Sequence, residues 1–511
     1  MHRLASLKLS RKERYIVFAV IAICYLFFPN PRPDFTVFNS HDSGSYLALS
    51  HNLIGGQGYT RNINGDFIPH TLWPPGMPLI LSPAVVFSGD KLNWYFVKYT
   101  MISFSLLALF ILWKLVFRLT KNDQLANFTV LIFSLNPYFW HFSRVALAES
   151  LVLLWIIASL WLIDHYWRDG KTTLKQAAIT GVICGAGMMI KGVVIGLALI
   201  PFCYAIKHWR DSKKRFPEVK LAAVFFIAFF LLFALWSARN SGIDRTGLGL
   251  DGVNQIQMLF KTVVEDPTSR YRTLPEIIQT AKENVLWHGI YNVSKQMVPT
   301  AWNWELKTMV YGKYLSLAIL LLAFALSIPK RFESLILWVV LSPIIVLMLL
   351  MVIGGAERYW LTISQIVSLA ILINWSKWLF PSDKKHKNKI ISSVGRFLYA
   401  GFAVIGLSLY ITDFEKSPYN PRDNYPSFGE FVMSLQDYCH QNEALVVNTK
   451  NPYAFYFITG CEAPMTNDYL GIHPNYNAIV QHKSLLKTQV PTEQIIHEHQ
   501  GWYLLRGPEQ K

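Results

Sequence analysis

The chain of 511 residues is 52% hydrophobic and only 16% charged, which is far more apolar than a soluble protein of this length. Its formal net charge of +16 does not indicate nucleic acid binding, because the basic residues fall in short clusters between apolar runs. Composition therefore excludes an ordinary soluble protein and predicts a polytopic membrane protein, with membrane lipids around it and no nucleic acid partner.

The first apolar run, near residues 15–29, follows a basic start in the way that a signal peptide does. The bulky, proline-rich segment Phe27–Pro31 stands where a small-residue cleavage site would be. We therefore expect this run to be the first membrane span.

The stretch from Asn39 to Pro78 follows that run and carries a carboxylate, histidines, tyrosines and a Pro-Pro-Gly turn, which no spanning helix would tolerate. Within it, the apolar spacing of Ser43–Leu53, with Gly55-Gly56 as a stop, predicts a short helix lying flat at the membrane surface. Asp42 stands where this helix should begin. It is either an N-cap or a reactive carboxylate oriented by the helix dipole, and the two roles are compatible.

A second short segment, Leu79 to Phe87, is apolar but far below the twenty or so residues that a spanning helix needs. It is expected to be a surface or re-entrant helix. The whole segment 30–94 then lies on one side of the membrane.

Further apolar runs bring the number of predicted spans to about eleven. They lie near residues 15–29, 95–117, 124–141, 145–164, 175–190, 193–207, 218–238, 312–328, 333–353, 359–380 and 391–411. Between them, basic clusters occur at Lys8–Arg14, Lys114–Lys121, Arg168–Lys175, Lys207–Arg215, Lys330-Arg331 and Lys384–Lys389. The positive-inside rule places all of these clusters and the N-terminus in the cytoplasm. The loops 30–94 and 239–311 and the tail 412–511 are then outside.

Glu149 begins the fourth span from the outside. A carboxylate in the first turn of a helix often only complements the helix dipole.

The segment 175–207 has basic flanks on both sides, so it must cross twice with a turn at Lys191-Gly192. Each arm of about fifteen residues reaches only about 22 Å of a core about 30 Å thick. Lys191 should therefore lie inside the protein, where an unpaired cation is costly. The alternative is that it snorkels outward from a loop.

Two arginines stand at the outer ends of later spans. Arg239, in Trp236–Asn240, leaves the seventh span, and Arg358 with Tyr359 opens the tenth. A guanidinium suits a phosphate at the edge of a low-dielectric region. The alternative for Arg358 is an Arg–Glu pair that only ties helix ends together.

The tail is predicted to be a small α/β domain. Ala444–Asn448 and Trp502–Leu505 have strand patterns, and Pro452–Phe457 has that of a short helix. No Cys or His spacing indicates a structural metal, and no glycine-rich phosphate loop indicates a soluble nucleotide.

The cysteines divide between the two predicted domains. Cys24, Cys184 and Cys203 fall in spans and are expected to be small core residues. Cys439 and Cys461 share the tail, where a disulfide and two free thiols stay equally open.

Several short motifs in this order resemble the GT-C glycosyltransferases, most closely the bacterial branch related to protein O-mannosyltransferases and to the aminoarabinose transferase of lipid A. The resemblance covers the spans and loops up to about residue 380. It rests on Asp42–Ala48, Asn52-Leu53, Gly56–Tyr59, Trp73–Pro78, Trp236–Asn240 and Gly354–Tyr359. The family transfers a sugar from a polyprenyl-phosphate carrier to an acceptor outside the cytoplasmic membrane.

The resemblance implies that Asp42 is the catalytic carboxylate. It further implies acceptor or sugar contacts from His41, Tyr46, Tyr59, Trp73 and Glu149, and lipid-phosphate contacts from Lys191, Arg239, Arg358 and Tyr359. Many relatives have a second acidic residue after the aspartate, where this chain has Ser43. No cofactor is expected. Because of this departure, it stays open whether a divalent metal takes part.

The expected reaction inverts the anomeric carbon. Asp42 would deprotonate an acceptor hydroxyl while the sugar leaves the lipid phosphate through an oxocarbenium-like state, and cations would stabilise the phosphate. The acceptor, whether lipid, glycan or protein, is not determined. By this resemblance the enzyme belongs in the bacterial inner membrane, in lipopolysaccharide or exopolysaccharide synthesis. A flippase for a lipid-linked saccharide and an O-antigen-type ligase or polymerase are the alternatives.

Overall fold

The computed structural model describes most of the first 380 residues and short pieces of the rest. The described ranges are 11–27, 41–63, 66–88, 94–212, 217–244, 253–263, 269–298, 310–351 and 357–380, with residues 397, 401, 404–406, 408, 435, 447–448, 478–482, 495–499 and 502–506 beyond them. The predicted helix Pro452–Phe457 and most of the predicted span 391–411 lie outside these ranges.

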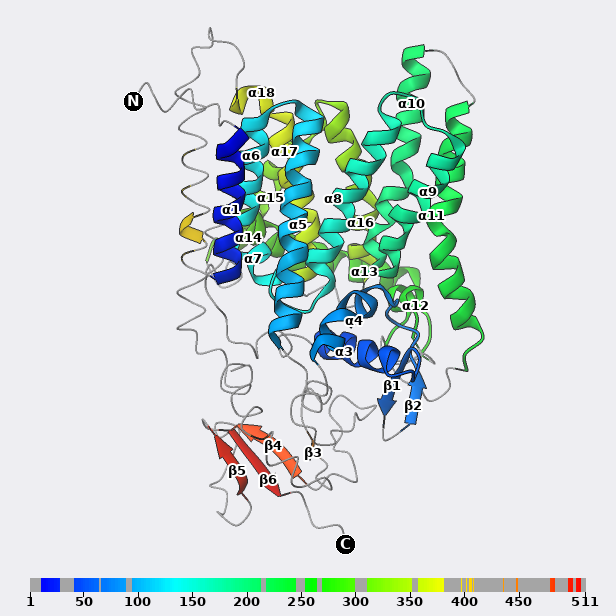
Figure 1. Ribbon diagram of the computed structural model, residues 1–511, viewed down its shortest axis with the longest axis vertical. Helices are drawn as coiled ribbons and strands as arrows, with labels where there is room; N and C mark the ends of the chain where they lie inside the picture. Colours follow the sequence, from blue (N-terminus) through cyan, green and yellow to red (C-terminus); the bar gives the residue numbers. More distant parts are fainter. Residues whose placement is uncertain are drawn as a thin grey trace.

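A bundle of roughly parallel helices forms the body of the protein (Figure 1). Its helices are α1 (Arg11–Phe27), α5 (Trp94–Thr120), α6 (Asp123–Ser134), α7 (Pro137–Phe142), α8 (Ala148–Trp167), α9 (Leu174–Gly185), α10 (Ile200–Ser212), α11 (Pro217–Ser241), α15 (Gly312–Ser327), α16 (Phe332–Leu350), α17 (Glu357–Asn374) and α18 (Ser376–Leu379). They coincide with the predicted spans from 15–29 to 359–380. By length and composition, five helices of the described part can cross a membrane, and these contain Tyr95–Thr120, Ala148–Trp167, Gly192–Asp211, Glu218–Ser241 and Phe332–Leu350.

The predicted span 124–141 is interrupted, because its sequence contains a helix start. Asn136 accepts hydrogen bonds from the backbone of Tyr138 and Phe139, and Pro137 occupies the first helical position. An asparagine cap followed by proline begins a helix and cannot continue one. The span is therefore divided into α6 and α7.

The segment 175–207 turns at Lys191, as predicted. On either side of it the chain forms 3-10 helix, in η2 (Ala186–Met189) and η3 (Gly192–Leu199). A 3-10 helix rises about 2.0 Å per residue, against about 1.5 Å for an α-helix. These two segments therefore extend the reach of arms that are short for the membrane.

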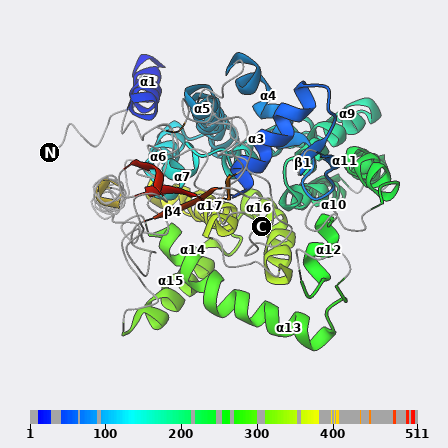
Figure 2. The same cartoon turned by 90° about the horizontal axis from the view of Figure 1, so that it is seen from below.

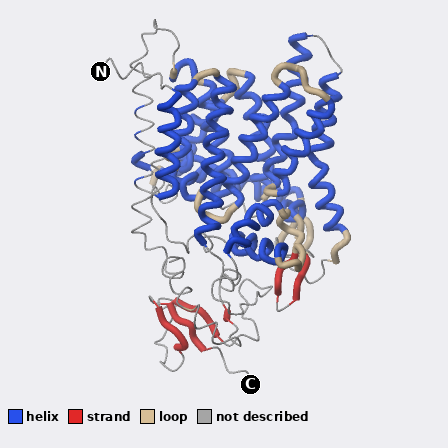
Figure 3. The backbone as a smooth tube through the Cα atoms, in the orientation of Figure 1, coloured by secondary structure: helices blue, strands red, loops and turns tan. Residues whose placement is uncertain are grey.

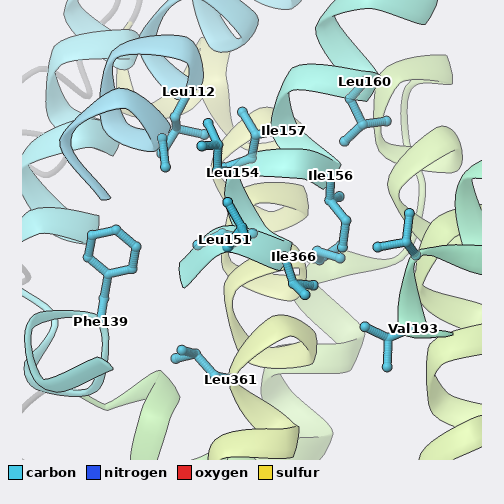
Figure 4. Packing of buried hydrophobic residues seen from close by; sticks show 14 of the residues in the cluster. Leu112, Phe139, Leu151, Leu154, Ile156, Ile157, Leu160, Val193, Leu361 and Ile366 are labelled. Carbon is cyan, nitrogen blue, oxygen red and sulfur yellow. The ribbon is translucent and has the colours of Figure 1, made fainter. Parts of the chain in front are cut away.

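Helix α8 lies at the centre of the bundle. It is the most enclosed of the five long apolar helices, with 72% of its apolar stretch buried. Figure 4 shows its Leu151 and Ile156 among apolar side chains from α5, α7, α17 and η3, including Phe139, Val193 and Leu361. This packing fixes the first turn of α8, which carries Glu149.

At the other end of the bundle from α3, a buried carboxylate joins three helices. Asp164 of α8 pairs with Arg118 of α5 at 2.5 Å and with Arg168 at 2.8 Å, and it accepts a hydrogen bond from Tyr204 of α10. Arg168 also lies 3.6 Å from Glu333 of α16. Two of the predicted cytoplasmic clusters thus meet at one end of the bundle.

The opposite end is covered by short elements from the two loops. They are α3 (His41–Ile54), the antiparallel strands β1 (Thr60–Ile63) and β2 (Asp66–Pro69), α4 (Gly76–Ser88), α12 (Gln255–Phe260), α13 (Leu274–Glu283), the π-turn η5 (Asn284–Gly289) and α14 (Ile290–Met297). Helix α3 lies across the bundle axis, as its amphipathic pattern predicted (Figures 1 and 2). The hairpin β1–β2 was not predicted.

In the tail the described residues form a four-stranded sheet that lies apart from the bundle, on the side of α3 (Figure 3). Its order is β3 (Val447–Asn448), β4 (Ala478–His482), β6 (Trp502–Arg506) and β5 (Ile495–His499), with β3 and β4 parallel and the other pairs antiparallel. The predicted strand Trp502–Leu505 is confirmed by β6. The α/β class of the whole tail stays a prediction.

The expectation for the membrane cysteines is confirmed only in part. Cys184 is buried, but Cys24 is exposed and Cys203 is intermediate. Cys24 lies beside the exposed apolar residues Ile23 and Phe27 of α1, a surface suited to lipid. Placing Cys24 in the core was therefore wrong.

Helices α9 and α11 approach closely through two glycines four residues apart. A Cβ on Gly181 would lie 2.5 Å from the carbonyl oxygen of Phe225, and one on Gly185 would lie 1.9 Å from that of Phe229. Small residues at this spacing let two helix backbones meet in a membrane. The pair therefore fixes where α9, and the turn after it, stand.

We expect Gly185→Ala to lower the thermal stability of the purified protein in detergent, because overpacking a tight contact costs about 1–3 kcal/mol. Gly242→Ala is the matched control, since a Cβ there meets only the carbonyl oxygen of Arg239 at 3.8 Å. Equal melting temperatures for the two variants would show that α9 and α11 can separate without loss.

Candidate functional site

A cavity of about 130 Å³ lies beneath α3, between the first loop and the ends of the bundle helices. Its walls come from the first loop, α8, the turn before η3, α12, α16 and α17. Four charged side chains from distant parts of the sequence stand at or beside it: Asp42, Glu149, Lys191 and Arg358.

Asp42 lies in the first turn of α3, where its sequence position predicted it. Nη2 of Arg358, from the first turn of α17, donates to Oδ2 of Asp42 at 2.6 Å and lies 3.1 Å from the hydroxyl oxygen of Tyr359. The side chain of Asp42 keeps 22% of its surface exposed, and it lines the cavity. The carboxylate is therefore held by an ion pair but can still be reached.

Glu149 lies in the first turn of α8 and is only 4% exposed. Its Oε1 accepts a hydrogen bond from Nζ of Lys191 at 2.8 Å and lies 3.9 Å from Nε of Arg358. The ammonium group of Lys191 also stands 4.6 Å from the centre of the Tyr359 ring. Lys191 thus points into the protein, as predicted, and its partner there is a carboxylate.

The position of Lys191 depends on a close contact with the first loop. A Cβ on Gly76 would lie 2.4 Å from the carbonyl oxygen of Met189, so only a glycine lets the two backbones meet there. The Pro-Pro-Gly turn of the loop therefore sets the height of the turn that carries Lys191.

The four charges alternate in sign along the series Asp42, Arg358, Glu149 and Lys191. Two carboxylates and two cations balance one another, which is what charges in a poorly solvated region require. A ligand that binds Lys191 or Arg358 must weaken, at least in part, the ion pair between that cation and its carboxylate. The arrangement can therefore couple the binding of an anion to a change at Asp42.

Aromatic residues of the first loop form one wall. Tyr46 and Trp73 line the cavity and meet edge to face, with ring centres 5.7 Å apart. Burial raises the pKa of Tyr46 well above its ordinary value, and the carboxylate of Asp42 raises it further. The phenol therefore stays protonated and can donate a hydrogen bond to a ligand.

Tyr59 supports this wall from behind. Its hydroxyl donates to the carbonyl oxygen of Trp73 at 2.9 Å, and it does not line the cavity. His70, which the sequence did not single out, stacks on Trp73 and accepts a hydrogen bond from its backbone N–H. Both residues orient Trp73.

Arg239 contacts the first loop. Its Nη1 donates to the carbonyl oxygen of His70 at 2.6 Å and its Nη2 to that of Tyr59 at 3.3 Å. It is not among the residues that line the cavity. This geometry gives Arg239 a part in holding the loop against α11, beside the lipid-phosphate role that the resemblance implies.

The remaining predicted residues are less informative. His41 begins α3, but its side chain lies outside the described part, as do Cys439 and Cys461. Within the described ranges, no group of three or more His, Cys, Asp or Glu side chains is placed to hold a metal ion.

Sequence reasoning missed the part of the wall that comes from α12 and α16. Gln255, Leu259 and Met348 line the cavity, and none of them belongs to a recognisable motif. The one local signal was Asn254, which caps α12 in a reciprocal pair with Gln257 and could have placed a helix start there.

Residues 52–241 match the family described as dolichyl-phosphate-mannose-protein mannosyltransferases, and no curated protein matches by sequence. The structure of ArnT from Cupriavidus metallidurans bound to undecaprenyl phosphate has a TM-score of 0.53 and 13% identity, over 98% of this chain and 100% of that one.

Two further structures are similar. ArnT from Cupriavidus metallidurans in the apo state has a TM-score of 0.50 and 11% identity, over 97% of this chain and 99% of that one. The Archaeoglobus fulgidus oligosaccharyltransferase in complex with Zn and sulfate has a TM-score of 0.50 and 12% identity, over 88% of this chain and 62% of that one. The chain therefore has the fold of the GT-C glycosyltransferases, and the resemblance indicated by its motifs is confirmed.

Proposed function

We propose that the protein is an integral-membrane glycosyltransferase that moves a sugar from a polyprenyl-phosphate donor to an acceptor hydroxyl on the outer side of a bacterial inner membrane. The observation that carries this proposal is the meeting of Asp42, Glu149, Lys191 and Arg358 around one cavity at the end of an apolar bundle. The acceptor is a lipid, a glycan or a protein.

The charges divide into a proton acceptor and a phosphate site. Asp42 is accessible and takes the proton of the acceptor hydroxyl, whose oxygen then bonds to the anomeric carbon from the face opposite the phosphate. The bond between that carbon and the phosphate oxygen breaks, so the configuration inverts. Both electrons of this bond stay with the leaving phosphate.

Cations beside the cavity make the phosphate a good leaving group. The negative charge on it grows during the reaction, and Lys191 and Arg358 are placed to stabilise that charge. As Asp42 becomes protonated it holds Arg358 less strongly, and the guanidinium is released toward the phosphate. The protein therefore needs no separate acid for the leaving oxygen.

A lipid donor suits both the fold and the location. The cavity lies at the end of helices with apolar outer surfaces, such as α16 with its exposed Leu335 and Val346, so a polyprenyl tail can remain in the membrane while the sugar reaches Asp42. The similar structure of ArnT was solved with undecaprenyl phosphate bound, which supports a donor of this class.

We expect Asp42→Asn to lower sugar transfer about 10²–10⁴-fold, the usual contribution of a positioned general base. Transfer is measured with the purified protein in membranes supplied with polyprenyl-phosphate sugars. Donor binding and the melting temperature are measured as well, and both should stay as in the wild type. Asp169→Asn, an exposed aspartate after α8, is the control. A variant that transfers normally would make Asp42 only a helix cap and Glu149 the next candidate.

Lys191→Met should weaken the binding of undecaprenyl phosphate about 10–100-fold, because a hydrogen bond to a charged group contributes about 1.5–3 kcal/mol. Lys175→Met, exposed in the first turn of α9, should bind as the wild type does. The double variant Glu149→Gln, Lys191→Met keeps the site neutral and separates lost phosphate contact from general instability. Unchanged binding in both Lys191 variants would remove this residue from the phosphate site.

We expect a chelator to leave the transfer rate unchanged, because Lys191 and Arg358 supply positive charge where the phosphate departs. The rate is measured before and after EDTA and again after Mg²⁺ or Mn²⁺ is restored. A loss with EDTA that either metal reverses would assign the metal a part in the reaction.

A further inference from the structure

Helix α12 forms one side of the cavity, although its sequence carries no motif. Gln255 and Leu259 both line the cavity, and residues four apart share a face of a helix. Gln255 is a polar residue of the wall, and its side-chain amide is uncharged. It has no part in the proposed mechanism.

The position of α12 is fixed from two directions. Oγ1 of Thr71, in the first loop, donates to the carbonyl oxygen of Val253 at 3.1 Å. Nη2 of Arg272 donates to the carbonyl oxygen of Leu259 and, at 2.7 Å, to that of Leu350 at the end of α16. Gln255 is therefore presented to the cavity by a helix tied to both neighbouring walls.

The amide of Gln255 is available to a ligand. In the described part of the chain it has no hydrogen-bond partner, and its Oε1 lies 3.2 Å from the point that a Cβ on Gly192 would occupy. An amide offers both donors and an acceptor. It can therefore bind a hydroxyl group in either direction.

A second unused polar atom belongs to the same cavity. Oε1 of Glu149 receives Lys191, but Oε2 is buried and has no hydrogen-bond partner among the described groups. A buried polar atom without a partner is costly, and a ligand hydroxyl group that donates to it would remove this cost. Gln255 and Glu149 together thus suit a molecule with several hydroxyl groups.

The surrounding charges favour a neutral ligand. Glu149 already has Lys191 at 2.8 Å and Arg358 at 3.9 Å, so an ammonium group at Oε2 would be the third cation around one carboxylate. The attraction of a further cation to Glu149 is therefore offset by repulsion from Lys191 and Arg358. A hydroxyl group meets no such repulsion.

We propose that Gln255 and Oε2 of Glu149 form the sugar subsite of this cavity, and that the sugar is a neutral one, bound through its hydroxyl groups, and not an amino sugar. This inference rests on the proposed function, and it names the substrate class of the same site.

The test compares two lipids with the purified protein: undecaprenyl phosphate and undecaprenyl-phosphate mannose. Gln255→Leu should weaken binding of the mannose-bearing lipid about 3–10-fold, the effect of one neutral hydrogen bond, and leave binding of the sugar-free lipid unchanged. Gln279→Leu, the same substitution at an exposed position of α13, should change neither. An equal loss for both lipids, or no loss, overturns the subsite, and the sugar-free lipid also reports whether the variant is folded.

The second arm addresses the sugar itself. The wild type should use the mannose-bearing donor with a kcat/KM at least about ten times that for undecaprenyl-phosphate 4-amino-4-deoxyarabinose. A higher kcat/KM for the donor that carries the amino sugar would overturn the proposal that the sugar is neutral. A wild type that binds undecaprenyl phosphate no better than the uncharged polyprenol overturns the proposed function itself, so the two failures are distinguishable.

Discussion

The site depends on the mutual compensation of four charges at the edge of an apolar bundle. Asp42, Arg358, Glu149 and Lys191 alternate in sign over contacts of 2.6–3.9 Å. In water such pairs contribute little, but where solvation is poor each charge needs its neighbour. The four elements that carry them must therefore converge, and the packing of the first loop, α8, the turn before η3 and α17 follows from that need.

Close backbone contacts make this convergence possible. Gly185 lets α9 meet α11, and Gly76 lets the first loop meet the turn after η2. Both contacts lie within six residues before Lys191, so this packing sets the position of Lys191. Arg239 adds a third constraint, because it binds the carbonyl oxygens of Tyr59 and His70 and so holds the loop that carries Asp42.

The same arrangement makes the site responsive to an anion. Each cation is shared with a carboxylate, so a phosphate that binds Arg358 or Lys191 changes the surroundings of Asp42 or Glu149. In the proposed mechanism, donor binding and the proton-accepting state of Asp42 are therefore linked through shared ion pairs. Gln255 stands outside this chain of charges, which suits it to contact the uncharged part of a ligand.

The sequence by itself determined most of the bundle helices. Apolar length predicted the spans, the Asn39–Pro78 pattern predicted α3 as a helix across the bundle, and the two short arms predicted a turn at Lys191 facing inward. Several short motifs, in their order along the chain, predicted the GT-C fold. These properties depend on local periodicity, helix length and charge distribution, which a single sequence contains.

Only the tertiary structure decided which charges pair. No local sequence pattern predicts that Asp42 pairs with Arg358, because the two are 316 residues apart. None predicts that Lys191 pairs with Glu149. The contacts of Arg239 with the loop and the place of Gln255 in the wall were equally hidden. Pairing between distant side chains depends on how whole helices pack, because a shift of a few ångströms exchanges one partner for another, and the sequence of each segment alone does not contain that distance.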